Sequence, residues 1–215
     1  DAFGIAVRIL RNTQKVYRSY LKYMENIYKS SIKSINFKDK TKGWQQRGIS
    51  INFENGKVYT NSTSDDPYIV SFHSRLNIRP SCFHCNYRGV KRISDITIGD
   101  FWGIKYKNHE YDDNKGTSFV LINSKKGESL LKKTQKFMKS NICDLDLRKY
   151  GELYNVCLVK SPEAPDEITR KCFYADLNLL NFGEIFDKYL IKIRDERKLR
   201  RQKYFDKIEE NNKIL

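Results

Sequence analysis

The sequence has no apolar run that approaches the roughly 20 residues needed to cross a bilayer as a helix. Its first residues, DAFGIAVRIL, lack the basic leader and cleavage site of a signal peptide, and they lack an initiator methionine. We therefore expect a cytoplasmic protein and take the chain to be an excerpt. Its 215 residues suffice for one sizeable domain or two small ones, and they can bury a core without disulfides.

Cysteine is scarce, and only two of the five cysteines have the spacing of metal ligands. These are Cys82 and Cys85 in SCFHC, whereas Cys143, Cys157 and Cys172 are scattered. Because no second CxxC exists, a four-cysteine zinc site built from two such pairs is excluded. The odd count also argues against a disulfide framework, and we expect reduced thiols.

The single CxxC pair leaves several chemistries open. Thiolates bind zinc and the iron of iron–sulfur clusters, and two at this spacing can hold one metal from a single turn. His84, between the cysteines, or His73 could join them in a mixed site. A thioredoxin-like dithiol is disfavoured because Arg79 and Pro80 precede the pair and no helical pattern follows. The structural alternative is a pair of reduced, partly buried thiols.

Acidic residues are also in short supply relative to basic ones. The chain has 41 basic and 26 acidic side chains, which gives a formal net charge of +15. Much of the excess lies in two helix-like ends, RNTQKVYRSYLKYMENIYKSSIK and KIRDERKLRRQKYFDKIEENNK. Such runs commonly do no more than solvate a helix face, but the excess keeps a nucleic acid or an anionic surface open as a partner.

The first part of the chain predicts a helix, a strand and a hairpin. Residues 13–33 repeat apolar side chains at helical spacing after an N-cap at Thr13. The repeating residues are Val16, Tyr20, Tyr23, Ile27 and Tyr28. SINF is typical of a short strand. In GISINFENGKVYT, alternating apolar residues flank Asn55 and Gly56, which supply the positive φ angles of a tight hairpin turn.

The remaining segments complete an α+β pattern. DDPYIVSFHSRL predicts a short helix capped by Asp65 or Asp66, with Pro67 in its first turn. SDITIGDF and TSFVLINS are strands, the second expected to be central, and KKGESLLKKTQKFMKS is a helix. After the proline-rich break SPEAPD the chain is helical. We predict an α+β fold with a mixed sheet, a hairpin, flanking helices and a basic helical C-terminus. Residues 1–160 would form one domain, and residues 161–215 a helical extension packing on it.

Charged, hydroxyl and glycine residues gather after the cysteine pair. Glycines let a backbone approach a ligand closely, and basic side chains pair with a pyrophosphate or another anionic group. An ordinary role in a turn or a helix cap explains each of these residues taken singly. Because so many of them lie beside the CxxC pair, we favour a cofactor site. The candidates are Lys91, Arg92, Asp95, Gly99, Asp100, Gly103, Gly116, Thr117 and Ser118.

Together these segments closely resemble the C-terminal domain of the coenzyme F420 hydrogenase/dehydrogenase beta subunit family. The resemblance is carried by RPSCFHCNYRGVKRISDITIGDFWGI and DDNKGTSFVLINSKKG, with IKSINFKDKTKGW and ISINFENGKVY before them and RKCFYADL after them. It covers residues 15–190. The cysteine pair, the SDIT-GDFWG strand and the KGTS strand occur together in the family's order.

The resemblance implies a subunit that transfers electrons with FAD and a 4Fe–4S cluster, to or from the deazaflavin coenzyme F420. Cys82 and Cys85 match two cluster thiolates. The positions that match the segments beside the flavin are Asp95, Thr97, Gly99, Asp100, Gly116, Thr117 and Ser118. Relatives in organisms without coenzyme F420 often lie among genes for surface-polysaccharide synthesis, which implies a role there.

Full-length relatives also carry a cysteine-rich, ferredoxin-like N-terminal half, which this sequence does not contain. A 4Fe–4S cluster needs about four protein ligands. We therefore expect such a half, or a redox partner protein, to supply the remainder. The favoured hypothesis is a fragment of an oxidoreductase. The alternatives are a basic module that binds zinc or nucleic acid, with nucleic acid the less expected partner, and a family member that has lost its cofactors.

Overall fold

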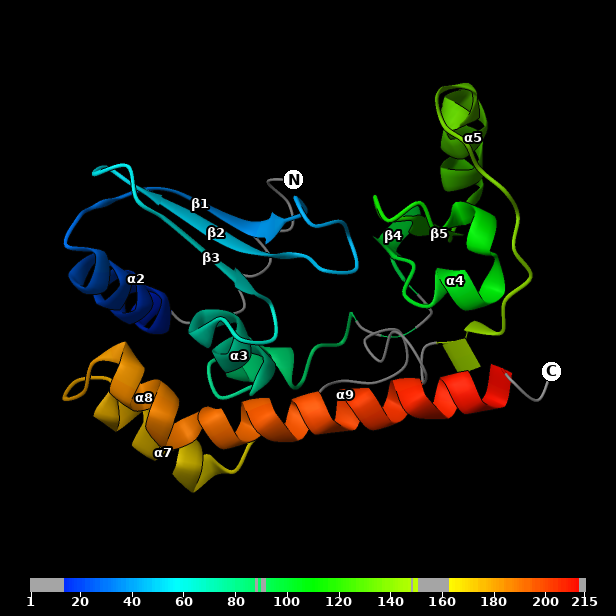
Figure 1. The fold of residues 1–215 in the computed structure, drawn as a ribbon. Coiled ribbons are helices and arrows are strands. Elements are labelled where there is room, and N and C mark those ends of the chain that lie inside the picture. Colours follow the sequence, from blue (N-terminus) through cyan, green and yellow to red (C-terminus); the bar gives the residue numbers. More distant parts are fainter. Residues whose placement is uncertain (1–13, 88, 90–91, 148, 151–162, 213–215) are drawn as a thin grey trace. The chain divides into compact units, whose positions relative to one another are not determined.

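The computed structural model describes residues 14–87, 89, 92–147, 149, 150 and 163–212 (Figure 1). They divide into two compact units. The first draws on Asp1–Lys42, Gln46–Pro80 and Ala164–Leu215, and the second on Gly43–Gln45 and Ser81–Glu163. The C-terminal segment thus shares a unit with the N-terminal part of the chain. The described residues between 81 and 163 belong to the second unit together with Gly43–Gln45.

The first unit contains a three-stranded antiparallel sheet in the order β1-β2-β3. Its strands are β1 (Ile32–Asp39), β2 (Gly48–Phe53) and β3 (Val58–Ser62). β2 alternates as the sequence predicts, with its apolar residues buried and Asn52 exposed. Gly56 has a φ of 80° in the turn, and the Asn55 side-chain amide donates a hydrogen bond of 3.0 Å to the Tyr28 carbonyl. The predicted hairpin is therefore confirmed, but the expectation of a positive φ at Asn55 is wrong, because only Gly56 of the two turn residues has one.

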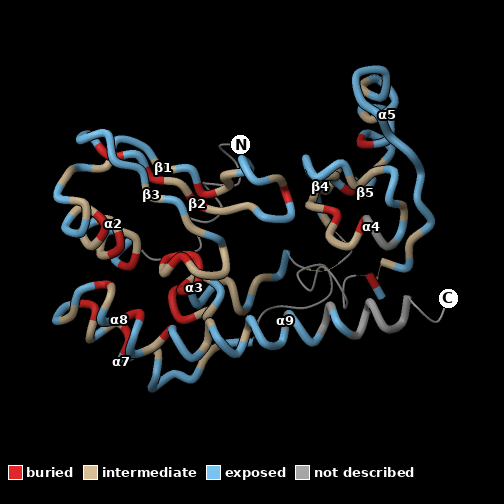
Figure 2. Tube along the Cα trace, in the orientation of Figure 1, coloured by how far each residue is buried: buried red, intermediate tan, exposed pale blue. Residues whose placement is uncertain are grey.

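Among the described residues of the first unit, five α-helices accompany this sheet. They are α2 (Gln14–Tyr28), α3 (Pro67–His73), α7 (Glu167–Asp176), α8 (Phe182–Tyr189) and α9 (Ile191–Asn212). α2 buries Val16, Tyr20 and Met24, whereas Ile27 is 52% exposed and was wrongly expected on the buried face. The predicted N-cap Thr13 lies outside the described residues. Figure 2 shows exposed residues along most of the described part of α9.

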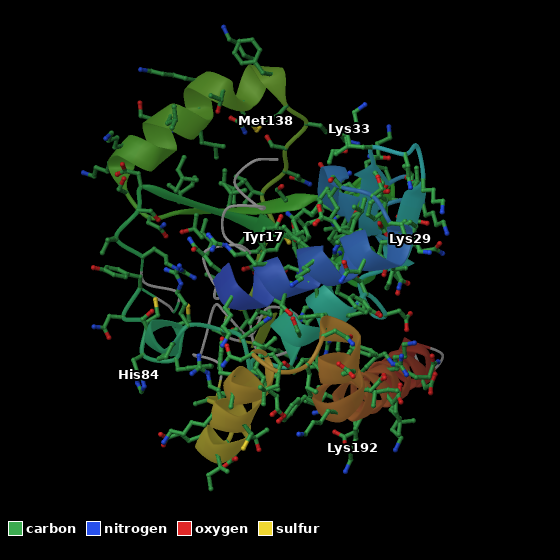
Figure 3. All side chains as sticks on the ribbon, turned by 90° about the vertical axis from the view of Figure 1, so that its left-hand side faces the viewer. Tyr17, Lys29, Lys33, His84, Met138 and Lys192 are labelled. Carbon is green, nitrogen blue, oxygen red and sulfur yellow. The ribbon has the colours of Figure 1, made fainter. Side chains whose placement is uncertain are left out.

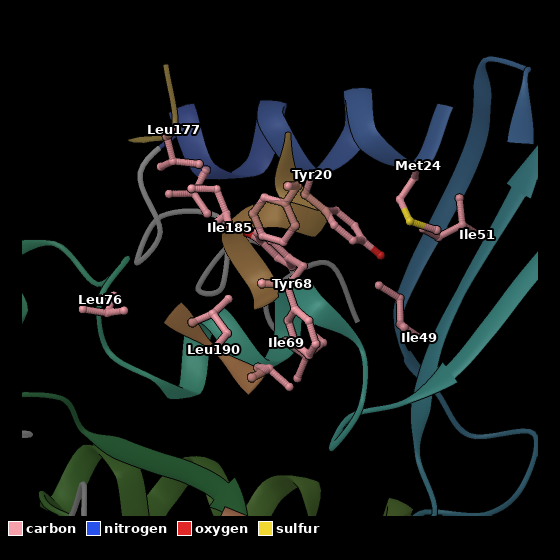
Figure 4. Close-up of a cluster of buried hydrophobic side chains, with 14 of the residues drawn as sticks. Tyr20, Met24, Ile49, Ile51, Tyr68, Ile69, Leu76, Leu177, Ile185 and Leu190 are labelled. Carbon is pink, nitrogen blue, oxygen red and sulfur yellow. The ribbon is translucent and has the colours of Figure 1, made fainter. Parts of the chain in front are cut away.

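The core of the first unit lies between α2, β2 and the helices α3, α7 and α8 (Figure 4). Met24 of α2 lies beside Ile51 of β2, and the Tyr20 and Tyr68 rings stack with centroids 5.2 Å apart. Asp66 caps α3 by accepting a hydrogen bond of 2.9 Å from the Ile69 amide, as one of the two predicted caps. Apolar burial on one stripe of each helix accounts for this packing.

The second unit is built around a two-stranded antiparallel sheet. β4 (Ile96–Asp100) pairs with β5 (Ser118–Ile122). The 3-10 helix η1 (Pro80–Cys82) precedes them, α4 (Ile104–Lys107) and η2 (His109–Tyr111) lie between them in the chain, and α5 (Lys125–Thr134) and η3 (Gln135–Phe137) follow. A small cluster of Phe101, Ile104, Phe119 and Tyr150 forms its core.

The α+β class is confirmed, but the expected mixed sheet is wrong for the described residues. They form two separate antiparallel sheets. A parallel pair requires a crossover connection that packs on the sheet, whereas the chain between β4 and β5 folds back so that Asp100 lies opposite Ser118. The prediction that TSFVLINS is central is also wrong for the part of the chain that the structure describes, where β5 pairs with β4 alone. No described helix is long and apolar enough to span a membrane.

Candidate functional site

The two cysteines of the CxxC flank a turn at the start of the second unit. Pro80 opens η1, where its fixed φ suits the first position of a helical turn, and Cys82 ends it. Phe83 and His84 form the turn, and Cys85 follows. Both thiols are free and half-buried. His84 is exposed and lies at the outer surface in Figure 3.

The described residues do not complete a cluster site. Nowhere among them do three or more His, Cys, Asp or Glu side chains come together as metal ligands. Cys143 and Cys172 are exposed elsewhere in the chain, and Cys157 lies outside the described residues. His73, considered as a further ligand, packs edge-on against Phe72 in the first unit. The CxxC pair therefore offers two of the roughly four thiolates that a 4Fe–4S cluster requires.

Asp95, a predicted cofactor residue, connects β4 to the beginning of α5. The Ser124 hydroxyl donates a hydrogen bond of 2.5 Å to its carboxylate, and the same hydroxyl oxygen caps α5 by accepting from the Gly127 amide at 3.1 Å. The hydrogen bond from Ser124 lowers the pKa of Asp95, and the Lys126 ammonium, 3.5 Å away, adds to this effect. The Asp95 carboxylate thus holds Ser124, the residue that caps α5.

Thr97 is held in the same junction. Its hydroxyl accepts a hydrogen bond of 3.0 Å from the Asn123 side chain, which also donates at 3.0 Å to the Ser94 carbonyl. The Ser94 and Thr97 hydroxyls lie 3.2 Å apart. Asn123 and Ser124 together fasten the end of β5 to the beginning of β4, and sequence reasoning missed both. For Ser124 the signal was its position directly before the predicted helix 125–140, because serine is a preferred N-cap.

Two of the candidate glycines, Gly99 in β4 and Gly116 just before β5, are explained by internal packing. A Cβ on Gly99 would lie 2.6 Å from the Phe119 ring. Gly116 has a φ of +103°, and a Cβ there would lie 2.6 Å from the Trp44 ring. Both contacts are far shorter than side-chain carbons adopt, so only glycine fits. The predicted reason, close approach to a ligand, is not needed at either position.

Trp44 and Trp102, the only tryptophans of the chain, pack together beside Gly116. Their ring centroids are 4.5 Å apart. The Trp44 amide donates a hydrogen bond of 2.7 Å to the Asn114 carbonyl, and the Thr117 hydroxyl donates to the Tyr111 carbonyl. The KGTS segment is therefore shaped by a tryptophan about 70 residues earlier, which sequence reasoning did not consider.

Asp100 and Ser118 remain on the outer face of the β4–β5 sheet. They are directly opposite one another and share this face with the pairs Ile98–Val120 and Ile96–Ile122. Ile98 is 69% exposed and Ile122 44% exposed. Of the ten predicted cofactor residues, the structure thus leaves these two and Arg92 for a ligand, while Lys91 lies outside the described residues. Gly103 is the N-cap of α4, where its φ of 77° suits glycine.

Arg92 closes the loop that follows the cysteine turn. One guanidinium nitrogen, Nη1, donates a hydrogen bond of 2.8 Å to the Tyr87 carbonyl. Its Nε is buried and has no hydrogen-bond partner among the described residues. A buried donor without an acceptor is costly, so this position suits an acceptor from a bound group or another part of the protein.

Comparison with known families gives these residues a context. The family described as the C terminus of the coenzyme F420 hydrogenase/dehydrogenase beta subunit matches residues 11–146, more than half of the chain. This chain belongs to that family. The match contains β1–β3, the cysteine turn and the β4–β5 sheet, whereas α7–α9 lie beyond it. The recognised resemblance is confirmed, over a shorter range than residues 15–190. Searches of curated proteins and of solved structures found no match.

Proposed function

We propose that this chain is the C-terminal part of an electron-transfer subunit of the F420 hydrogenase/dehydrogenase beta type. The family match across residues 11–146 is the observation that carries this proposal. The matched segment includes the CxxC turn, the outer face of the β4–β5 sheet and Arg92. In such subunits FAD would exchange a hydride with a soluble coenzyme, and a 4Fe–4S cluster would exchange single electrons.

The residues of this chain would take limited roles in holding those groups. Cys82 and Cys85 would provide two thiolates, and a ferredoxin-like half or a redox partner protein would provide the rest. The unpartnered Nε of Arg92 would donate to an anionic cofactor group. Asp100 and Ser118 would contact it from the outer sheet face. Asp95, Thr97, Gly99, Gly116 and Thr117 would support the site only through the internal contacts described above.

The setting of the activity is also a proposal. We infer a cytoplasmic oxidoreductase that takes electrons from a deazaflavin or a similar hydride-carrying coenzyme. Its products would serve the synthesis of surface polysaccharide.

The test is to measure the metal and flavin content of the purified protein. The protein is expressed without oxygen from its full reading frame. We expect bound flavin and iron, with the brown colour of an iron–sulfur protein. The double variant Cys82→Ser/Cys85→Ser should lose iron, whereas the exposed control Cys143→Ser should keep it. Colourless wild-type protein without flavin or iron would overturn the proposal. Zinc in place of iron would favour the basic zinc-binding module instead.

A further inference from the structure

We propose that Cys82 and Cys85, when no metal is bound, form a reversible intramolecular disulfide. The two residues are three apart and flank the turn at Phe83 and His84. The ends of a four-residue turn lie within about 7 Å of one another, and a disulfide joins Cα atoms about 4.4–6.8 Å apart. The turn therefore brings the two cysteines within bridging range without a change of fold.

The two thiols are accessible and are not committed to a ligand set within the described residues. Both are free and half-buried, so an oxidant in solution can reach them. The described chain brings no third His, Cys, Asp or Glu to them as a metal ligand. The described residues therefore provide fewer ligands than a 4Fe–4S cluster needs. This shortfall leaves thiol chemistry open to the pair whenever metal is absent.

A disulfide here would be a switch and not a structural crosslink. The stabilisation from a disulfide grows with the length of the loop it closes, and this loop contains only the residues of one turn. The bridge would therefore add little to folding, and a cellular dithiol could reduce it. The Arg92 hydrogen bond to the Tyr87 carbonyl holds the chain just after the turn, so closing the bridge needs little further ordering.

The reaction with a small-molecule disulfide such as oxidised glutathione balances in two exchanges. One cysteine thiolate attacks a glutathione sulfur, which breaks its S–S bond, forms a protein–glutathione disulfide and releases one glutathione thiol. The second cysteine then attacks the sulfur of the first cysteine, which forms the Cys82–Cys85 bond, breaks the bond to glutathione and releases the second glutathione thiol. The protein gives up two electrons and two protons, and oxidised glutathione becomes two reduced molecules.

The bridge and metal binding would exclude one another. A cysteine binds metal as its thiolate, and a disulfide sulfur has no thiolate to offer. Oxidation of the pair would thus switch off any metal binding to which Cys82 and Cys85 contribute. This inference concerns the chain without metal, and it stands whether or not the proposed electron-transfer role is correct.

The test uses a chelator-treated triple variant, Cys143→Ser/Cys157→Ser/Cys172→Ser, in which only the pair remains. After oxidised glutathione we expect an intact mass lower by two hydrogen atoms and loss of both alkylatable thiols together. Dithiothreitol should restore both. In the same background, Cys82→Ser and Cys85→Ser each leave a single cysteine. That cysteine should react only as far as the protein–glutathione disulfide, because no second thiol is present to displace the glutathione. A wild-type pair that instead carries glutathione, or that keeps two alkylatable thiols, would overturn the proposal.

Peptide mapping of the wild-type chain keeps the test decisive if the triple variant does not fold. Trypsin does not cut Arg79–Pro80, so one peptide, residues 76–88, carries both cysteines. Its mass should fall by two hydrogens after oxidation. Peptides with Cys143 or Cys172, which are exposed single thiols, should gain glutathione instead. Glutathione on residues 76–88 would contradict the bridge. The iron and flavin content of the protein tests the proposed electron-transfer function and does not bear on this result.

Discussion

At the scale of single residues, Asp66 is a carboxylate with no solvent exposure. It accepts hydrogen bonds from the Tyr20 hydroxyl at 2.8 Å, the Tyr59 hydroxyl at 3.1 Å and the Ile69 amide at 2.9 Å. Desolvation by burial raises the pKa of Asp66, and these three donors offset part of that rise. One side chain thereby joins α2, β3 and α3.

Replacing Asp66 should destabilise the first unit in proportion to the acceptors lost. Asp66→Ala removes a helix cap and leaves the buried Tyr20 hydroxyl without its acceptor, so the free energy of unfolding should fall by about 2–4 kcal/mol. Asp66→Asn keeps an acceptor for the Ile69 amide and should cost less. Urea unfolding followed by far-ultraviolet circular dichroism measures both. Equal losses in the two variants would show that the hydrogen bonds do not matter.

The same residue predicts a pH dependence. Because the folded pKa of Asp66 is raised, its contribution is fully present below its unfolded pKa and is lost as pH rises through the folded pKa. The stability of wild type relative to Asp66→Asn should therefore decline from acid toward neutral pH. Urea unfolding of both proteins at a series of pH values gives this difference. A difference that grows as pH rises would contradict the raised pKa.

Gly116 offers a second test at this scale. Gly116→Ala adds a methyl group 2.6 Å from the Trp44 ring at a φ of +103°, so it should destabilise the second unit by roughly 2–4 kcal/mol. Because both tryptophans lie in that unit, tryptophan fluorescence reports on it alone. The control Gly56→Ala meets nothing within 4 Å at a φ of +80° and should cost only its backbone strain. An unchanged fluorescence transition in Gly116→Ala would contradict the packing.

These glycines show why the site was harder to predict than the fold. Gly99 and Gly116 were correctly recognised as positions that need a bare backbone. The neighbours that need the space, Phe119 and Trp44, become visible only in three dimensions. The sequence therefore identified the two glycine positions, but we attributed the need for glycine to a ligand and not to these aromatic rings.

At the scale of elements, β4 and α5 depend on one junction. Ser124 caps α5 through the Gly127 amide and donates to Asp95, so it joins a strand to a helix. Ser124→Ala should raise hydrogen exchange at the amides of residues 125–128, with a loss of about 1 kcal/mol typical of a missing cap. The exposed Ser129→Ala in the same helix should leave exchange unchanged or slower, because alanine favours helices. Similar exchange in both variants would contradict the cap.

Local elements were predicted better than their assembly. The 48–62 hairpin and the helix after Asp66 follow from turn residues, caps and periodicity, all of which act within a few positions. The number of sheets and the partner of β5 depend on residues far apart in the chain, and one sequence does not contain that information. Residues 164–212 likewise share a unit with residues 14–42 and 46–80, which are far from them in the chain.

At the scale of the whole molecule, the family match ends at residue 146 and the basic helix α9 lies beyond it. Residues 191–203 of this helix carry seven basic and two acidic side chains. Several are engaged within the first unit, such as Lys198 with Asp65 and Arg194 with Asp195. These ion pairs balance part of the basic charge of α9 within the first unit.

The most direct test of electron transfer is anaerobic titration of the naturally extended protein with reduced coenzyme F420, followed by absorbance. We predict that the coenzyme is oxidised in step with bleaching of a protein-bound chromophore. Cys82→Ser/Cys85→Ser should lose the iron–sulfur part of that bleaching, while Cys143→Ser should behave as wild type. Coenzyme that stays reduced beside a loaded protein, or oxidation that does not depend on any bound chromophore, would contradict an electron-transfer role.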